Sequence, residues 1–398
     1  MIHCFNPGHE TAVLNASKHY QPAANLLKMQ RDLAFLPAWY ADPGDFVWVE
    51  EDLTDTFRRD IRDLHCNIHP LTVHQIKEKA NALAGQRVEL WGLSPQSIHR
   101  FGQISRQYGL GWQVPAWKEA FRSLGSRTTA CHVLTCLTQA IPELNGGLIP
   151  TFVSSREELE EYVGSCPGKW LVKSPFSSSG RGLVWLPPGA PGQSERQIIG
   201  GMLKRQSQVS IERALDKVMD FSMHFGTNAE GHIRFTGYSV FRTNEKGAYK
   251  STCIAAQETL EKQISRFIRN DLLLQVKNEL LHILPQTYAP YDSGHIGVDM
   301  LVYRTGNEYA LHPCVEINMR KSMGYLAIVL QQKYLHSQTK ASFQIDYEAS
   351  PGRLPEKHCL LKQQHPAVIE NGRMLSGYLS LCPVTDAGCY HAYLLCEY

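Results

Sequence analysis

Residues 315–320 read Val-Glu-Ile-Asn-Met-Arg, and this short segment carries more chemical information than any other part of the chain. If it is a β-strand, side chains alternate between the two faces, so Glu316, Asn318 and Arg320 point the same way. That face then holds two hard oxygen donors and a fixed positive charge, which suits a magnesium-bound triphosphate and the charge that develops during phosphoryl transfer. A polar strand facing solvent would show the same alternation, so the segment alone leaves both interpretations open.

A second acidic residue lies upstream, in a segment that predicts a β-hairpin. Residues 297–303 are β-rich, and a turn-forming cluster follows at 304–308 before the chain returns to Glu316. With a two-residue turn, the numbers of paired residues add up to an odd constant, so Asp299 and Glu316 fall on the same face; a three-residue turn without a bulge would separate them. With the two-residue turn, Asp299, Glu316 and Asn318 form an oxygen-only cluster, which favours Mg²⁺ that arrives together with phosphate.

A small-residue loop between two strand-like runs predicts a phosphate-binding site. The run 169–173 ends in Lys173, the loop Ser-Pro-Phe-Ser-Ser-Ser-Gly-Arg-Gly follows at 174–182, and a second apolar run occupies 183–186. Glycines let the backbone approach a ligand closely, and consecutive N–H groups can surround an anion. A flexible hairpin loop would have a similar composition, but Lys173 and Arg181 favour anion binding. The chain contains neither a Gly-x-x-x-x-Gly-Lys-Ser/Thr nor a Gly-x-Gly-x-x-Gly segment.

The motifs, and the order in which they follow one another along the chain, resemble those of the ATP-grasp superfamily, whose members hold ATP between two α+β subdomains. Most members use ATP to convert a carboxylate to an acylphosphate, which a nucleophile then attacks. The resemblance covers roughly residues 120–330 and implies that Lys173 contacts the α- and β-phosphates and that Arg320 stabilises the transferring phosphoryl group. It also implies that the loop covers the phosphates through Ser177, Ser178, Ser179, Gly180, Arg181 and Gly182.

The resemblance further implies where the nucleoside and the metal bind. Glu212 and Leu215 would face adenine at a hinge between the subdomains, and Asp220 would face the ribose hydroxyls. Arg127 precedes a helical stretch where many members carry a lysine, and it could keep the phosphate contact because arginine stays charged and binds in a bidentate manner; a solvated surface arginine is the alternative. The metal, Mg²⁺ or Mn²⁺, would be held by Asp299, Glu316 and Asn318.

One position departs from the family pattern. Many ligases of this family carry an arginine two residues before the first metal-binding aspartate, where this chain has Gly297. Either Arg320 supplies the charge alone, or another residue such as His295 or Lys321 contributes. For His295, a hydrogen-bonded position at the end of a strand is the simpler interpretation. The departure concerns catalysis rather than nucleotide binding.

The N-terminal third predicts a separate α/β unit. Apolar runs at 2–5, 46–49 and 88–91 alternate with helical segments, which indicates a small parallel sheet. Ligands of such sheets gather at the carboxyl ends of the strands. The residues that follow the first run are therefore candidates for a substrate site, although a plain polar turn also explains them: Asn6, His9 and Glu10.

The predicted fold is α+β, with an ATP-grasp fold of two α+β subdomains clamping ATP. A small α/β parallel-sheet domain precedes it, and a β-rich C-terminal appendage follows. Residues 23–40 are predicted to be helical, and apolar spacing over about 257–284 predicts one helix that buries one face and ends at Pro285. The predicted boundaries are 1–118 for the first domain, 119–210 and 211–340 for the two subdomains, and 341–398 for the appendage.

Composition is that of an ordinary globular enzyme. The chain has 398 residues, of which 43% are hydrophobic and 20% charged, and its formal net charge of +2 predicts no broad basic field for nucleic acid. Its 11 cysteines lack Cys-x-x-Cys spacing, which predicts reduced thiols in a cytoplasmic protein. Neither a signal-peptide pattern nor a membrane-spanning run is found.

Together these features predict an ATP- and Mg²⁺-dependent ligase that activates a small-molecule or peptide carboxylate as an acylphosphate for attack by an amine or another nucleophile. The expected partners are these two small molecules and, in a homodimer, a second copy of the chain; neither nucleic acid nor membrane is expected. Two alternatives remain, namely an ATP-grasp kinase that phosphorylates a small molecule and stops there, and a non-catalytic ATP-binding sensor. No motif specifies the substrate.

Overall fold

The computed structural model divides the chain into two compact units. Unit 1 contains Met1–Lys118, Ser251–Leu260 and Arg320–Tyr398, and unit 2 contains Glu119–Lys250 and Glu261–Met319. Each unit is therefore built from segments that are distant in the sequence, and the division into the four domains 1–118, 119–210, 211–340 and 341–398 stays a prediction. The structure describes residues 1–177, 182–227, 232–245, 247–288, 291 and 294–397.

Unit 1 begins with the small parallel sheet. Its strands pair in the order β3-β2-β1-β4, and every pair is parallel, so this prediction is confirmed. Most of the strand residues are buried, as expected where helices cover both faces of a parallel sheet. Sequence reading missed β3, because His69 and Pro70 are poor strand formers. The strands are β1 (Ile2–Cys4), β2 (Phe46–Trp48), β3 (His69–Leu71) and β4 (Val88–Leu90).

The helices of this segment are short. The single helix expected over 23–40 is wrong, because α2 ends at Asp32 and a separate 3-10 turn follows. A continuous helix would bring the ring of Pro37 against the carbonyl of Leu33. The elements are α1 (His9–Asn15), α2 (Ala24–Asp32), η1 (Leu36–Trp39), α3 (Asp55–Asp60), η2 (Arg62–Leu64), η3 (Val73–Gln75), α4 (Ala80–Leu83) and α5 (Pro95–Gln107).

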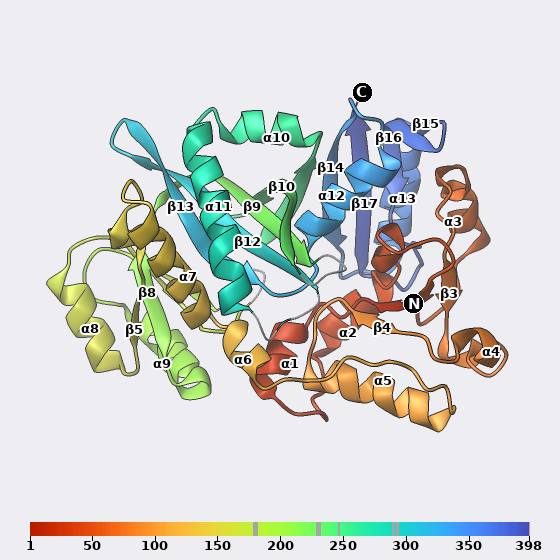
Figure 1. The fold of residues 1–398 in the computed structure, drawn as a ribbon, viewed down its shortest axis with the longest axis horizontal. Helices are drawn as coiled ribbons and strands as arrows, with labels where there is room; N and C mark the ends of the chain where they lie inside the picture. The colour runs from red at the N-terminus through yellow and green to blue at the C-terminus, as the bar shows by residue number, and fades with distance from the viewer. Residues whose placement is uncertain (178–181, 228–231, 246, 289–290, 292–293, 398) are drawn as a thin grey trace. The chain divides into compact units, whose positions relative to one another are not determined.

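The C-terminal segment of unit 1 is β-rich, as predicted. Strand β14 pairs with β17, β17 with β16 and β16 with β15, all antiparallel. Residues 251–254 of β11 pair with β14, and α12 lies along β16 (Figure 1). The elements are β11 (Tyr249–Ile254), α12 (Met323–Tyr334), β14 (Lys340–Tyr347), α13 (Arg353–Gln364), β15 (Val368–Glu370), β16 (Arg373–Ser380) and β17 (Tyr390–Glu397).

One hydrophobic core joins the two ends of the chain within unit 1. Trp39 is fully buried; its indole Nε1 donates to the carbonyl of Leu381 at 2.8 Å, and its ring meets Tyr334 edge-on with centroids 5.0 Å apart. Phe5 and Leu394 belong to the same cluster. The C-terminal strands therefore complete the core of the N-terminal segment, since the short parallel sheet alone would leave large apolar side chains exposed.

Unit 2 contains a four-stranded sheet in the order β5-β8-β6-β7. The hairpin predicted around the serine-glycine loop is confirmed, because Lys173 at the end of β6 pairs with Leu183 at the start of β7 in an antiparallel ladder. The elements are α6 (Ala120–Leu124), α7 (Arg127–Ala140), η4 (Gly146–Leu148), β5 (Thr151–Val153), α8 (Arg156–Ser165), β6 (Trp170–Lys173), β7 (Leu183–Leu186), α9 (Gln193–Gln206) and β8 (Val209–Arg213).

The second sheet region of unit 2 has the antiparallel order β13-β12-β9-β10. Helices α7 and α11 contact each other, with α7 against β13 and α11 against β10 (Figure 1). Alternate residues such as Phe221, Met223 and Val298 are buried apolar residues, which leaves the other face available for polar side chains. The elements are β9 (Asp216–Thr227), β10 (Ile233–Thr243), α11 (Asn270–Thr287), β12 (His295–Thr305) and β13 (Glu308–Asn318).

The single helix expected over 257–284 is wrong. Helix α10 (Gln257–Ile264) stops well before α11 begins, and Pro285 lies inside the last turn of α11. Ser265 follows α10, and its backbone N–H still donates to the carbonyl of Glu261 at 2.8 Å, so helical hydrogen bonding reaches this residue before the chain leaves the helix. The apolar spacing was nevertheless a sound guide to burial: Phe267 is only half-buried, but the other residues of the predicted apolar face are all buried, namely Leu260, Ile264, Ile268, Val276, Leu280, Ile283 and Leu284.

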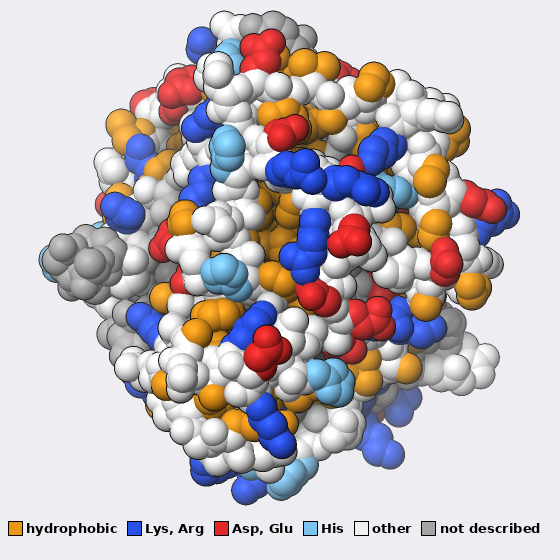
Figure 2. All heavy atoms as spheres, turned by 90° about the vertical axis from the view of Figure 1, so that its right-hand side faces the viewer, with side chains coloured by type: hydrophobic (Ala, Val, Ile, Leu, Met, Phe, Trp, Pro, Cys, Tyr) orange, Lys and Arg blue, Asp and Glu red, His pale blue; other side chains and the backbone are white. Residues whose placement is uncertain are grey.

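The surface carries charges of both signs. On the face shown in Figure 2, Lys and Arg side chains lie among Asp and Glu side chains and hydrophobic ones. Within the described ranges, no helix combines the length and the apolar character needed to cross a membrane. The cysteines, Cys4 to Cys396, are all free thiols.

Candidate functional site

The β12–β13 hairpin places two acidic side chains opposite each other. Its turn consists of residues 306–307, and an uninterrupted ladder from this turn would pair Asp299 with Cys314. A register shift pairs Asp299 with Glu316 instead. Pro313 lies in the shifted segment, and a proline cannot donate to the ladder, which explains an irregularity at this point. The hairpin prediction is confirmed, because directly paired residues lie on the same face.

Hydrogen bonds hold the carboxylate of Asp299 from two sides. The hydroxyl of Ser222, which lies opposite Asp299 on β9, donates to Oδ1 at 2.6 Å, and Nδ2 of Asn318 donates to Oδ2 at 2.9 Å. Glu316 in turn accepts from Nη2 of Arg127 at 3.0 Å. No group of three or more His, Cys, Asp or Glu residues in the described ranges could hold a metal. A cation at this hairpin would therefore also need amide, water or phosphate oxygens.

Arg127, the first residue of α7, also belongs to this cluster through its contact with Glu316. Its side chain is only 9% exposed, so the alternative of a solvated surface arginine is wrong. Nε donates to the carbonyl of Ser174 at 3.1 Å, Nη1 to the carbonyl of Val315 at 3.4 Å and Nη2 to the hydroxyl of Ser177 at 3.2 Å. The guanidinium thus joins the start of the serine-glycine loop to β13.

Lys173 and Glu212 form a buried ion pair. The ammonium lies 2.6 Å from Oε1 of Glu212, with side-chain exposures of 5% and 13%. Burial lowers the pKa of Lys173, and Glu212 counteracts this effect. The residue expected to contact phosphate and the residue expected to face adenine are therefore in direct contact.

Only the two ends of the serine-glycine loop are described. A hydrogen bond connects these two ends, because the N–H of Ser174 donates to the carbonyl of Gly182 at 2.9 Å. Gly182 has φ +68°, and a Cβ there would lie 3.0 Å from the hydroxyl of Ser174, so the position favours glycine. The remaining loop residues that were expected to contact phosphate lie outside the described residues: Ser178, Ser179, Gly180 and Arg181.

A cavity of about 240 Å³ in unit 2 gathers most of the expected nucleotide-site residues. At one end the carboxylate of Asp220 accepts hydrogen bonds from Lys217 at 2.6 Å and from Thr243 at 2.9 Å. The expected residues on the cavity wall are Arg127, Lys173, Ser177, Glu212, Leu215, Asp220, Asp299 and Glu316.

Sequence reading missed the rest of the wall. Half of these remaining residues are apolar, and nothing in the sequence separates these strand residues from ordinary core: Leu171, Leu183, Trp185, Phe241, Met300, Leu301 and Val315. His312 was also missed as a site residue. For Ser222 a signal existed, because Asp220, Ser222 and His224 alternate along one strand and therefore share a face.

Gly297 makes room for a neighbouring imidazole. It pairs with His224 on β9, and a Cβ at position 297 would lie 3.3 Å from that ring. Nδ1 of His224 lies 2.9 Å from Nε2 of His295, and its Nε2 lies 3.0 Å from the hydroxyl of Ser239. Burial lowers the pKa of His224 to about 3, so the ring is neutral at neutral pH. His224 therefore fills the space of the missing side chain without supplying its charge, and His295 is a hydrogen-bonded strand residue.

We expect Gly297→Arg to lower the free energy of unfolding by about 2 kcal/mol, because the added side chain overpacks the buried ring of His224. Urea denaturation measures the change. The double variant Gly297→Arg/His224→Ala should recover part of the loss, since it removes the obstructing ring. An unchanged unfolding midpoint for Gly297→Arg would contradict the assignment of this space to His224.

The remaining candidates form a polar cluster in unit 1, at the carboxyl ends of β1 and β4. Strand β13 ends at Asn318, so the strand alternation expected for Glu316, Asn318 and Arg320 does not extend to Arg320. The Nε atom of Arg320 lies 2.5 Å from Oε1 of Glu10, and the other carboxylate oxygen of Glu10 lies 3.2 Å from Nδ1 of His9. Burial by itself would raise the pKa of Glu10, but Arg320 and His9 hold it below its usual value.

The side chain of Asn6 connects the carboxyl ends of β1 and β4 through hydrogen bonds to the backbone of Gly92. Its Nδ2 donates to the carbonyl of Gly92 at 2.7 Å, and its Oδ1 accepts from the N–H of Gly92 at 3.1 Å. Gly92 also makes room for His9, because a Cβ there would lie 2.4 Å from the imidazole. The position of His9 therefore depends on a glycine at the end of the neighbouring strand.

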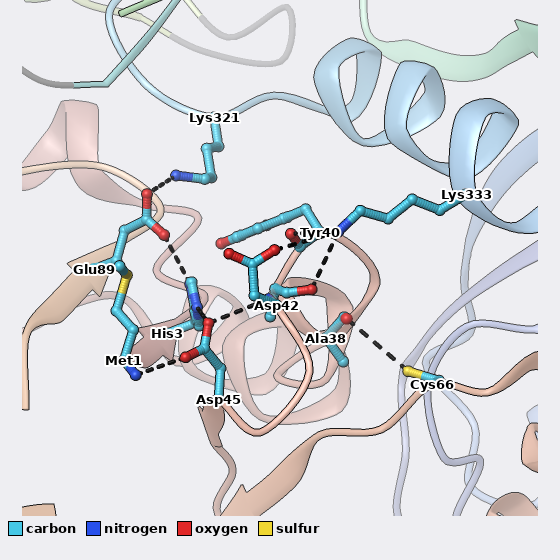
Figure 3. A network of polar contacts seen from close by, with 11 residues as sticks. Met1, His3, Ala38, Tyr40, Asp42, Asp45, Cys66, Glu89, Lys321 and Lys333 are labelled. Carbon is cyan, nitrogen blue, oxygen red and sulfur yellow. Dashed lines mark hydrogen bonds and ion pairs between the residues drawn. The ribbon is translucent and has the colours of Figure 1, made fainter. Parts of the chain in front are cut away.

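A chain of charged contacts holds Lys321 in the same unit (Figure 3). The ammonium contacts Oε1 of Glu89 and lies 4.9 Å from the ring centroid of Tyr40. The other oxygen of Glu89 is 2.7 Å from Nδ1 of His3, whose Nε2 is 2.9 Å from Asp45. Arg320 and Lys321 are thus each held by a glutamate of the N-terminal segment.

No family model matches the sequence, and no curated protein is similar to it. Solved structures do share the fold. Biotin carboxylase from Campylobacter jejuni, in a β-γ-ATP complex, matches with a TM-score of 0.53 and 8% identity over 100% of this chain and 87% of that chain. The biotin carboxylase domain of 2-oxoglutarate carboxylase from Hydrogenobacter thermophilus, with MgADP, ADP and bicarbonate, matches with a TM-score of 0.52 and 8% identity over 92% and 84%.

Proposed function

The chain has the ATP-grasp fold, and from this premise we propose that it is an ATP- and Mg²⁺-dependent ligase. It would activate a carboxylate as an acylphosphate for attack by an amine or another nucleophile. The observation that carries the proposal is the cavity of unit 2, whose wall combines apolar side chains with Lys173, Arg127 and two opposed carboxylates. The ATP and MgADP ligands of the two similar structures support the same assignment.

The cavity wall suggests how the nucleotide lies. The apolar side chains would enclose the base, next to Glu212, and Asp220 with Lys217 and Thr243 would take the ribose hydroxyls. Lys173 and Arg127 would neutralise phosphate charge. Arginine suits this role because its planar guanidinium can contact two phosphate oxygens at once.

The opposed carboxylates fit a magnesium ion. Asp299 and Glu316 offer hard oxygens, Asn318 adds an amide, and Ser222 and Arg127 already orient the two carboxylates. Bound there, Mg²⁺ would withdraw charge from the phosphate oxygens.

Two bond-forming steps follow from the proposed reaction class. A substrate carboxylate oxygen attacks the γ-phosphorus, a new O–P bond forms and ADP leaves. The nucleophile then attacks the acyl carbon and expels inorganic phosphate, which with an amine leaves an amide after loss of a proton. Arg320 would stabilise the negative charge on the transferring phosphoryl group, because phosphoryl transfer depends chiefly on positioning and charge neutralisation.

A screen of carboxylate and amine pairs for ADP release tests this proposal. An amide plus inorganic phosphate supports the ligase. A stable phosphorylated acceptor would show a kinase instead, and tight ATP binding without turnover across a broad panel of metabolites would show a sensor. Direct detection of each product separates the three outcomes.

Ser222→Ala is expected to weaken divalent-cation affinity by about 10- to 100-fold, because the lost hydroxyl orients Asp299. Mn²⁺ binding in the presence of ADP, followed by electron paramagnetic resonance, measures this without any turnover. Ser239→Ala is the matched control, since Ser239 pairs with Ser222 on the adjacent strand but contacts His224. Equal Mn²⁺ affinity in both variants would contradict the assignment of Asp299 as a ligand.

A further inference from the structure

An open cavity of about 750 Å³ lies in unit 1, beside the carboxyl end of β2. Its lining residues belong neither to the cavity of unit 2 nor to the polar cluster around Arg320. Ligands of parallel sheets gather at the carboxyl ends of the strands, so this position favours a binding site. The polar side chains of the wall are those of Glu50, Arg100, Gln103, Arg106 and Gln107.

Helix α5 supplies most of these side chains, and its packing places them at the cavity. Phe101 is only 1% exposed, and its ring meets that of Trp48 edge-on with centroids 5.3 Å apart. This contact holds the helix against the end of β2. Residues three and four apart lie on the same side of a helix, and four lining residues of α5 follow this spacing: Arg100, Gln103, Ile104 and Gln107.

The two arginines of α5 bring positive charge to one wall of the cavity. Cζ of Arg100 lies 5.9 Å from the ring centroid of Trp48, and this cation–π contact holds the guanidinium beside β2. The side chain of Arg106 runs back along the helix, because a Cβ at Gly102 would lie 3.5 Å from its Nη1. The charge of Arg106 is thus brought toward that of Arg100.

These two charges lack a counter-ion within the described part of the chain, where neither guanidinium forms an ion pair or a hydrogen bond. Glu50 lines the same cavity without pairing with either of them. Both signs of charge act on the thiol of Cys4 at the end of β1: burial raises its pKa to about 12, Arg100 opposes this rise and Glu50 adds to it. Two positive charges on one wall repel each other, and an anion bound there would relieve this repulsion.

We propose that this cavity of unit 1 binds the phosphate group of a phosphorylated small molecule. The guanidiniums of Arg100 and Arg106 donate to the phosphate oxygens, because each planar group can contact two oxygens at once. A phosphate monoester carries a charge close to −2 at neutral pH, which matches the two arginines, whereas a single carboxylate would neutralise only one of them.

The rest of the wall suits the remainder of such a ligand. The carboxamides of Gln103 and Gln107 and the carboxylate of Glu50 can accept hydrogen bonds from hydroxyl or amino groups, and Ile104 and Val49 offer apolar contacts. The inference goes beyond the proposed function, since it concerns a second ligand and a site with none of the nucleotide-binding residues.

Arginine-selective labelling with phenylglyoxal tests the site residue by residue. The full chain is labelled with and without phenyl phosphate, which combines a dianionic phosphate with an apolar ring, and peptide mass spectrometry measures the modification of each arginine. We expect phenyl phosphate to protect Arg100 and Arg106 over the same concentration range. Arg62 is the matched control and should stay reactive, because it is an exposed arginine of unit 1 outside this cavity.

Two further ligands and two variants sharpen the test. Inorganic phosphate should protect both arginines at higher concentration than phenyl phosphate, since it lacks the apolar ring, and benzoate, a monoanion, should protect them least. Arg100→Gln should raise the concentration of phenyl phosphate that protects Arg106 by about 10-fold, as for loss of one charge-assisted hydrogen bond. Arg106→Gln should do the same for the protection of Arg100.

Three results would overturn the inference: labelling of Arg100 and Arg106 that phenyl phosphate does not reduce, equal protection of Arg62, or benzoate that protects as well as phenyl phosphate. An unchanged protection midpoint in a variant that still melts cooperatively would also overturn it. If one of the two variants does not fold, the other decides. The labelling involves neither ATP binding nor turnover, so its outcome is independent of the proposed function.

Discussion

Arg320→Ala is expected to lower kcat for ADP release by about 10³-fold while leaving ATP affinity nearly unchanged. A cation that acts mainly on the charge developing in the transition state affects turnover far more than ground-state binding. Steady-state assays give kcat, and calorimetric titration gives the dissociation constant for ATP. Full turnover in Arg320→Ala would show that Arg320 does not stabilise the transition state.

The ion pair with Glu10 provides the control for this experiment. Glu10→Gln removes the negative partner of Arg320 but keeps the guanidinium. If Arg320 acts only by anchoring the N-terminal segment, both variants should lose activity equally. If its charge acts in phosphoryl transfer, Glu10→Gln should retain much more turnover than Arg320→Ala, and Arg320→Lys should retain an intermediate level because lysine keeps the charge without the bidentate geometry.

Lys173→Met is expected to lower the free energy of unfolding by about 3–5 kcal/mol and to abolish measurable ATP binding. The substitution leaves the carboxylate of Glu212 buried without its counter-ion, and breaking a buried pair from one side carries this cost. Urea denaturation followed by fluorescence gives the change in stability, and calorimetric titration gives the change in binding.

A double variant distinguishes the destabilisation caused by one unpaired buried charge from the contribution of the ion pair to the free energy of unfolding. Lys173→Met/Glu212→Leu removes both buried charges and should recover most of the lost stability, although not ATP binding. Arg196→Ala is the control, since Arg196 and Glu160 form an ion pair at 2.8 Å whose side chains are 43% and 41% exposed; such pairs contribute about 1 kcal/mol or less. A double variant no more stable than Lys173→Met would contradict this account.

Local patterns predicted the elements around the site well. The hairpin ending in Glu316 and the strand-loop-strand unit after Lys173 follow from strand alternation and turn chemistry, which act over a few residues. The same kind of reasoning failed over 257–284, because the backbone leaves the helix between Ile264 and Asn270 although the apolar spacing continues past this break. Apolar periodicity reports which face is buried and does not report whether the backbone is continuous.

Long-range packing decided the rest. The pairing of Asp299 with Glu316 depends on a register shift near Pro313, and the burial of Arg127 depends on carbonyls of Ser174 and Val315 that lie far away in the sequence.

The order of the motifs, the residue types available for nucleotide and metal, and the parallel and β-rich character of the two ends of the chain could all be predicted from the residues along the chain. Three features emerge only from packing: the two ends share one core around Trp39, Lys173 forms an ion pair with Glu212, and His224 fills the space left by Gly297. The physical reason is that alternation and turn preference are set by adjacent residues, whereas burial and ion pairing depend on atoms that folding alone brings together.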